Sequence, residues 1–169
     1  MTDRLQSEPA LVQFSERLTN SAAFGALFRE GMDLVEETAA YLDGVGRTEA
    51  KALDRSVSLT YATESMRLTT RLMQLASWLL LHRAVKEGEM TLSQANREKT
   101  KVKLSAADPS PEDMLLKLPE QLQVLIARSM TLQTKVRRLD TNIHAAAEPA
   151  PIGNPLMPQL NRLRAAFER

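Results

Sequence analysis

Few side chains in this sequence have the type and spacing that catalysis or metal binding requires. There is no cysteine, and the only histidines are His82 and His144. The residues three positions before them are Leu79 and Thr141, so the Glu-x-x-His pairs of a di-iron bundle are absent, and no third histidine exists to complete a zinc site. The segment Gly44-Val45-Gly46 lacks the third glycine and the preceding strand of a phosphate-binding loop. We therefore expect no catalytic residue, no bound metal and no cofactor.

Glu64 stands out among the carboxylates because it lies in a stripe of apolar residues. Together with Glu36 and Glu37 it could form a set of carboxylates for acid–base chemistry. The simpler interpretation is an ion pair, since Arg67 and Arg71 follow at one and two helical turns. Arg71 could also reach Glu36 or Glu37 across two helices, and we expect such a buried pair to fix the register of the helices.

Two basic segments offer positive charge for binding. The first, residues 97–103, carries a local charge of +3, and the second contains Lys135, Arg137 and Arg138. Nucleic-acid binding through the first segment is one interpretation, yet neither segment has an interleaved aromatic side chain for base stacking, and the net charge of the chain is only +1. A solvated helix face or a docking surface for an acidic protein fits better. The residues that we assign to partner docking here are Arg97, Lys99, Lys101 and Lys103.

Helices must position these side chains. The chain is 43% hydrophobic but only 4% aromatic, which is typical of packed helices rich in Leu and Ala. Residues 47–87 contain no proline or glycine, and their apolar residues recur three or four positions apart, so the pattern predicts one continuous helix of about 60 Å. Gly88 ends it. Thr91 to Gln94 fits a capping box, which starts a short basic helix over 92–103.

Two more helices complete the predicted bundle. The first extends from about Ser21 to Leu42, ends at Gly44 and folds back through a short connection at 43–47. The last begins near Pro119 and has a seam with alternating spacings of three and four, as in a coiled coil. That seam consists of Leu122, Leu125, Ser129, Leu132, Val136, Leu139 and Ile143.

The pattern as a whole predicts an all-α fold. We expect an antiparallel three-helix bundle with one very long central helix, an extra short helix and a disordered C-terminal tail. The predicted organisation is an N-terminal arm at 1–19, the bundle domain at 20–145 and the flexible tail at 146–169.

The most apolar stretch of the long helix predicts a homodimer. Residues 72–81 include eight apolar side chains, which point in every direction around the helix. A helix that is apolar all round must be buried all round, and we expect two neighbouring helices to be too few to cover it, so a second subunit is the simplest partner. The predicted interface contains Leu72, Leu75, Trp78, Leu79 and His82.

The location of the protein follows from what the sequence lacks. The apolar stretch is half the length of the ~20 residues that cross a bilayer, and the N-terminal MTDRLQSEPA does not fit a secretory signal. We expect a cytoplasmic protein without membrane insertion.

The tail offers a second docking element. Four of the eight prolines come after His144, so no long helix is expected before Pro158. Leu160, Leu163 and Phe167 then recur at helical spacing, as in a segment that folds into the groove of a partner. We assign these three residues to partner docking as well.

Three segments together resemble one known family: residues 28–42 (FREGMDLVEETAAYL), 61–81 (YATESMRLTTRLMQLASWLLL) and 116–119 (LKLP). It is the alphaproteobacterial family typified by the regulator of CtrA degradation, RcdA. The resemblance covers roughly residues 12–145. It implies a cytoplasmic helical-bundle homodimer, and a non-enzymatic adaptor that helps the ClpXP protease receive cell-cycle substrates such as CtrA. It also implies CpdR and PopA as associated partners, and it transfers no catalytic residue.

Overall fold

The structure is a computed structural model that describes residues 22–101 and 110–147, and this part of the chain is all-α. The described helices are α2 (Ala22–Asp43), α3 (Val45–Lys51), α4 (Arg55–Lys86), α5 (Leu92–Lys101), α6 (Glu112–Leu115) and α7 (Glu120–Ala147). The predicted all-α class is confirmed. The predicted arm 1–19, Lys103 and the tail after Ala147 lie outside the described residues.

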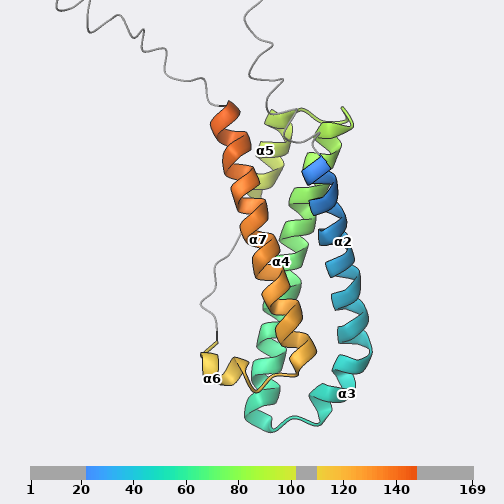
Figure 1. Cartoon of the computed structure of the whole chain (residues 1–169), viewed down its shortest axis with the longest axis vertical. Helices are drawn as coiled ribbons and strands as arrows, with labels where there is room; N and C mark the ends of the chain where they lie inside the picture. The colour runs from blue at the N-terminus through green and yellow to red at the C-terminus, as the bar shows by residue number, and fades with distance from the viewer. Residues whose placement is uncertain (1–21, 102–109, 148–169) are drawn as a thin grey trace, which may run out of the picture.

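Helices α2, α4 and α7 pack side by side as the body of the bundle (Figure 1). α2 runs antiparallel to the other two. α4 and α7 run parallel to each other, since Arg71 meets Ser129 and, farther along both helices, Trp78 meets Asp140. α5 lies near one end of the bundle and α6 near the other.

The core consists of the apolar stripes that the spacing predicts. The stripe of α4 at spacings of three and four is buried, as predicted, and Trp78 joins it; its residues are Val57, Tyr61, Glu64, Leu68, Leu72, Leu75, Leu79 and His82. On α7 every predicted seam residue is buried except Leu139, which is partly buried and packs against the core. Gly31 allows α2 to approach closely, because a Cβ atom there would lie 2.4 Å from Leu79 Cδ1.

The predicted continuous helix over 47–87 is wrong, because the chain turns at 52–54, between α3 and α4. Asp54 has extended backbone angles (φ −60°, ψ 152°), and its carbonyl oxygen accepts a hydrogen bond from Ser58 N at 2.7 Å. Aspartate is favoured at such an N-cap position and disfavoured inside a helix. Only Gly44 separates α2 from α3. The chain therefore reverses after α3, and not at the predicted connection 43–47.

The predicted boundary between α4 and α5 is confirmed. Gly88 has φ 75°, and Glu89 N donates to the Ala84 carbonyl at 3.0 Å, as in a Schellman motif. Thr91 N donates to Gln94 Oε1 at 2.9 Å, and Gln94 N donates to Thr91 Oγ1 at 3.2 Å. These caps end α4 and start α5, so they help to place α5 against α4. α6 is a single turn that the apolar spacing does not predict.

Candidate interaction surfaces

Asp140 joins three helices where α5 packs near α4 and α7. Trp78 Nε1 donates a hydrogen bond to Asp140 Oδ1 at 2.9 Å, and Lys99 Nζ donates to the same oxygen. Burial raises the pKa of Asp140, but the hydrogen bonds from Lys99 and Trp78 outweigh it and hold the pKa below its usual value. His144 lies one turn on, with Nδ1 3.7 Å from Asp140 Oδ1. The carboxylate is thus engaged in holding the helices together.

His82 lies beside this cluster and is enclosed by the core. Its ring packs on that of Trp78 with centroids 4.1 Å apart, and the side chain is 1% exposed. Burial lowers the pKa of His82 to about 4, and its Nδ1 has no hydrogen-bond partner in the described part of the chain. A neutral, enclosed imidazole cannot exchange protons with a substrate at neutral pH, which fits a structural role.

Glu64 forms a second buried cluster, and the predicted ion pair is confirmed. Arg67 Nη1 lies 2.6 Å from Glu64 Oε1, and the Ser110 hydroxyl donates to the same oxygen at 2.5 Å. Burial raises the pKa of Glu64, but the hydrogen bonds from Ser110 and Arg67 outweigh it, so the pKa lies below its usual value. The cluster ties the chain just before α6 to α4.

Arg71 does not have the partner that its position suggests. Its guanidinium donates to Ser129 Oγ at 2.7 Å, whereas Glu37 pairs with Arg128 of α7 at 2.6 Å. The reason is geometric: Arg71 lies on the side of α4 that faces α7. The carboxylates named in the acid–base interpretation are therefore separated, with Glu64 in one cluster and Glu37 in another.

The five residues assigned to a dimer interface are buried within a single chain. Their exposed fractions are 0–4%: Leu72, Leu75, Trp78, Leu79 and His82. Their assignment counted two neighbouring helices, but α5 is a third neighbour of α4, with Leu92 and the buried Ala95 facing the bundle. Their burial therefore requires no second subunit, and homodimerisation stays a prediction.

The opposite side of α4 carries exposed apolar residues at intervals of seven, which we call the α4 seam. They are Leu59, Met66, Met73 and Leu80, with exposed fractions of 71%, 72%, 66% and 53%. Seven residues are close to two helical turns, so the four side chains lie on one face.

The face around the α4 seam has no charge. From Ser56 to Leu81 the only Asp, Glu, Lys or Arg residues are Glu64, Arg67 and Arg71, and all three belong to the clusters described above. The hydroxyls of Thr63, Thr69 and Ser77 donate to backbone carbonyls of their own helix, so they do not depend on water. This face is suited to packing against another helix. Both the intervals of seven and the absence of charge can be seen in the sequence. A search of the sequence for buried positions alone does not detect them, because these residues are exposed.

The residues assigned to partner docking on α5 differ in their availability. Lys99 is taken up by Asp140. Arg97 is exposed but has an interaction of its own, and Lys101 is the last residue of α5. The other assigned residues lie outside the described part of the chain: Lys103, Leu160, Leu163 and Phe167. Because Lys99 is engaged in an ion pair with Asp140, this segment offers less positive charge to a nucleic acid than its sequence suggests.

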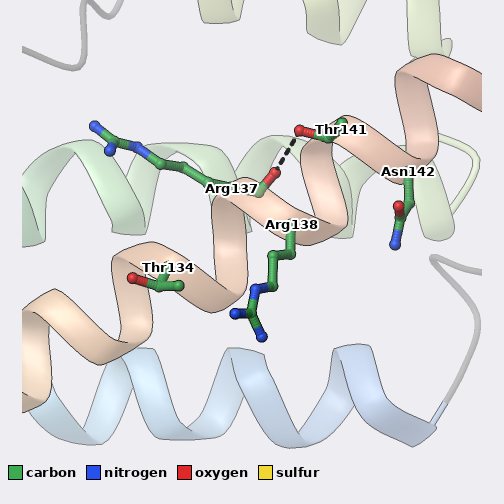
Figure 2. Close-up of a pocket in the computed structure, with 5 residues that line it drawn as sticks. All are labelled: Thr134, Arg137, Arg138, Thr141 and Asn142. Carbon is green, nitrogen blue, oxygen red and sulfur yellow. Dashed lines mark hydrogen bonds between the residues drawn. The ribbon is translucent and has the colours of Figure 1, made fainter.

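A surface pocket lies on α7, in the second basic segment (Figure 2). It has a volume of about 490 Å³, and the described residues that line it are Thr134, Arg137, Arg138, Thr141 and Asn142. All five are exposed. Thr141 donates its hydroxyl to the Arg137 carbonyl at 2.9 Å, so the guanidiniums and the Asn142 amide are the groups left to bind a ligand.

Within the described residues, no three His, Cys, Asp or Glu side chains gather closely enough to hold a metal ion. None of the helices described here is long and apolar enough to cross a membrane.

Comparisons with known proteins place these features in context. A family described as "Protein of unknown function (DUF1465)" matches residues 15–167. Among solved structures, the crystal structure of RcdA from Caulobacter crescentus CB15 has 49% sequence identity and a TM-score of 0.62. The match covers 76% of this chain and 96% of that chain. A search of curated proteins found no significant match.

Proposed function

We propose that this chain, which belongs to the DUF1465 family together with RcdA, is a non-enzymatic adaptor in regulated proteolysis. In this proposal it promotes delivery of cell-cycle substrates, such as the response regulator CtrA, to the ClpXP protease through protein–protein contacts. CpdR and PopA are the proposed associated partners. The observation that carries the proposal is the 49% identity to RcdA over 96% of that chain.

The distribution of side chains supports a function by contact. The buried carboxylate of Glu64 and the partly buried carboxylate of Asp140 are engaged by neighbouring side chains, and His82 is enclosed. The surface, in contrast, offers the uncharged α4 seam and a pocket lined by arginines. A protein with this distribution is better equipped to hold partners than to transform a substrate.

We also propose that the chain is a homodimer and that the α4 seam is its interface. The seam extends over about 30 Å of helix, and its intervals of seven match the repeat by which two helices pack side by side. An exposed apolar face of this length without charges is uncommon on a monomer. The proposal replaces the five buried residues with Leu59, Met66, Met73 and Leu80 and keeps the dimer itself.

Light scattering tests the dimer. The wild type should have about twice the monomer mass of 18.9 kDa, and Met73→Glu should reduce the mass to that of the monomer, because a charge would lose its water in the apolar interface. Leu116→Glu is the matched control, since Leu116 is 68% exposed and lies off the seam. A monomeric wild type, or a dimeric Met73→Glu variant, would contradict the interface.

A reconstituted degradation assay tests the function. Purified ClpXP, CpdR and PopA are mixed with CtrA, and the rate of CtrA loss is measured with and without this protein. We expect a faster loss of CtrA that saturates with protein concentration, and no effect on a substrate that ClpXP degrades without a delivery factor. An unchanged rate for CtrA and for other cell-cycle substrates would refute the adaptor role.

A further inference from the structure

The four Lys and Arg side chains of α7 form two groups: two of them have ion-pair partners on α2, and two do not. Arg128 pairs with Glu37 at 2.6 Å, and Lys135 pairs with Glu30 at 2.9 Å. Arg137 and Arg138 have no ion pair or side-chain hydrogen bond within the described residues. Two exposed guanidiniums on one turn of helix are thus left with all their donors unused.

The register of α2 and α7 explains why Arg138 has no partner. The two ion pairs lie seven residues apart on both helices, Glu37 with Arg128 and Glu30 with Lys135. The same step leads next to Ala23 of α2 and Asn142 of α7, with Arg138 between Lys135 and Asn142, and α2 has no acidic residue before Glu30. The series of ion pairs between the helices therefore ends before Arg138, because α2 supplies no carboxylate at this level.

The pocket on α7 lies at this level. Figure 2 shows Arg138 and Asn142 extending from α7 on the side of α2, while Arg137 extends in a different direction. The two guanidiniums therefore flank the pocket instead of converging on one point. This arrangement suits two separate anionic groups on one ligand better than a single phosphate.

Carboxylates fit this surface better than a nucleic acid does. The described lining contains no aromatic ring on which a base could stack. α2, next to the pocket, has five acidic residues and a single basic one, so a long phosphate backbone that continued along the bundle would be repelled. The carboxylates of Glu30 and Glu37 already bind the same flank of α7.

We infer that the α7 face formed by Thr134, Arg137, Arg138, Thr141 and Asn142 binds a short acidic segment of a partner protein, with one carboxylate on each arginine. Glu37 and Glu30 of α2 pair with basic residues of α7. The carboxylates of the partner segment would form the next such pairs along α7. The inference rests on the proposed function only in taking the ligand to be part of a protein.

Fluorescence anisotropy at low ionic strength tests this site with the full-length protein. The probe is a fluorescein-labelled peptide of eight glutamates, and the reference probes are eight glutamines and a thymidine oligonucleotide of eight nucleotides. The R137Q/R138Q variant should bind the glutamate peptide roughly five- to thirtyfold more weakly, as expected for the loss of two exposed ion pairs. The matched control R128Q/K135Q removes the same charge from the paired residues of α7 and should change the affinity less than about twofold.

Each other outcome overturns the inference. Equal weakening in both double variants would mean that only net charge matters. Tighter binding of the oligonucleotide, lost in R137Q/R138Q, would assign the surface to nucleic acid. Absence of glutamate-peptide binding to the wild type would remove the site. Because no protease takes part in this titration, a failure here leaves the proposed adaptor function to be judged by its own degradation assay.

Discussion

Acidification should weaken this bundle in a pH range set by His82. In the unfolded chain the imidazole takes up a proton near its ordinary pKa of 6.5, whereas burial lowers the pKa in the fold to about 4. Between these values the unfolded state binds more protons than the folded state, so the free energy of unfolding falls as the pH drops from about 6.5 to about 4.

The difference between the folded and unfolded pKa values of His82 gives the size of the decrease in the free energy of unfolding. One unit of pKa difference corresponds to about 1.4 kcal/mol, so the shift of His82 corresponds to roughly 3 kcal/mol between neutral pH and pH 4. Burial is the largest cause of the lowered pKa of His82; Asp140 raises that pKa, while Lys99 and His144 lower it. The lowered pKa values of Asp140 and Glu64 act in the same direction but at lower pH, where those carboxylates take up protons.

Urea unfolding at several pH values measures the effect, with far-UV circular dichroism as the signal. His82→Leu replaces the ring with a side chain of similar size that does not titrate, so its free energy of unfolding should fall much less between pH 6.5 and pH 4.5. His144→Gln, at the half-exposed histidine, is the control and should keep the wild-type decrease. If His82→Leu loses as much stability as the wild type over that range, His82 is not the cause.

Three further predictions concern packing and the tail. Gly46→Ala should destabilise the fold by about 1–3 kcal/mol, because its Cβ would lie 2.7 Å from the Tyr41 carbonyl oxygen; Gly25→Ala, with open space around it, should stabilise by up to ~1 kcal/mol in the same thermal melts. Glu64→Ala should cost about 1–3 kcal/mol in urea unfolding, because Arg67 and Ser110 lose their partner. Truncation after Ala147 should leave the helicity and the dimer intact but slow CtrA degradation in the reconstituted assay; a truncated protein that unfolds would make the tail structural.

The helical stripes could be predicted from the sequence because residues three or four positions apart lie on the same face of an α-helix. The seam of α7 and the α4 stripe through Glu64 depend on that period alone, so the spacing places even this buried carboxylate on the correct face. The turn at 52–54 could not be predicted from proline or glycine, because residues 47–87 contain neither. Asp54 was its one local signal, as an N-cap residue inside a stretch that otherwise favours helix.

Contacts between distant helices could not be predicted in the same way. The pairing of Lys99 with Asp140 depends on where α5 crosses the bundle, and the caps around Gly88 and Thr91 specify only where α5 begins. The spacing likewise indicates that residues 72–81 are apolar on all sides of the helix. It does not indicate how many helices of the same chain pack against them. α5 packs against α4 as a further neighbour, so the five residues assigned to the dimer interface are buried within one chain.

The placement of charge on α4 leaves one face of the bundle suited to binding. Glu64 and Arg67 pair with each other and contact Ser110, and Arg71 donates to Ser129 of α7. The charged residues of this stretch are thus engaged by other parts of the bundle, and the outer face of α4 carries no charge. The α7 pocket lies on another helix and faces away from the core. If two chains pack through the α4 seam, each keeps its own pair of arginines exposed, and one dimer presents two copies of that face. A partner with two acidic segments would then be held by both subunits at a high effective concentration, and such a gain from assembly requires no catalytic residue.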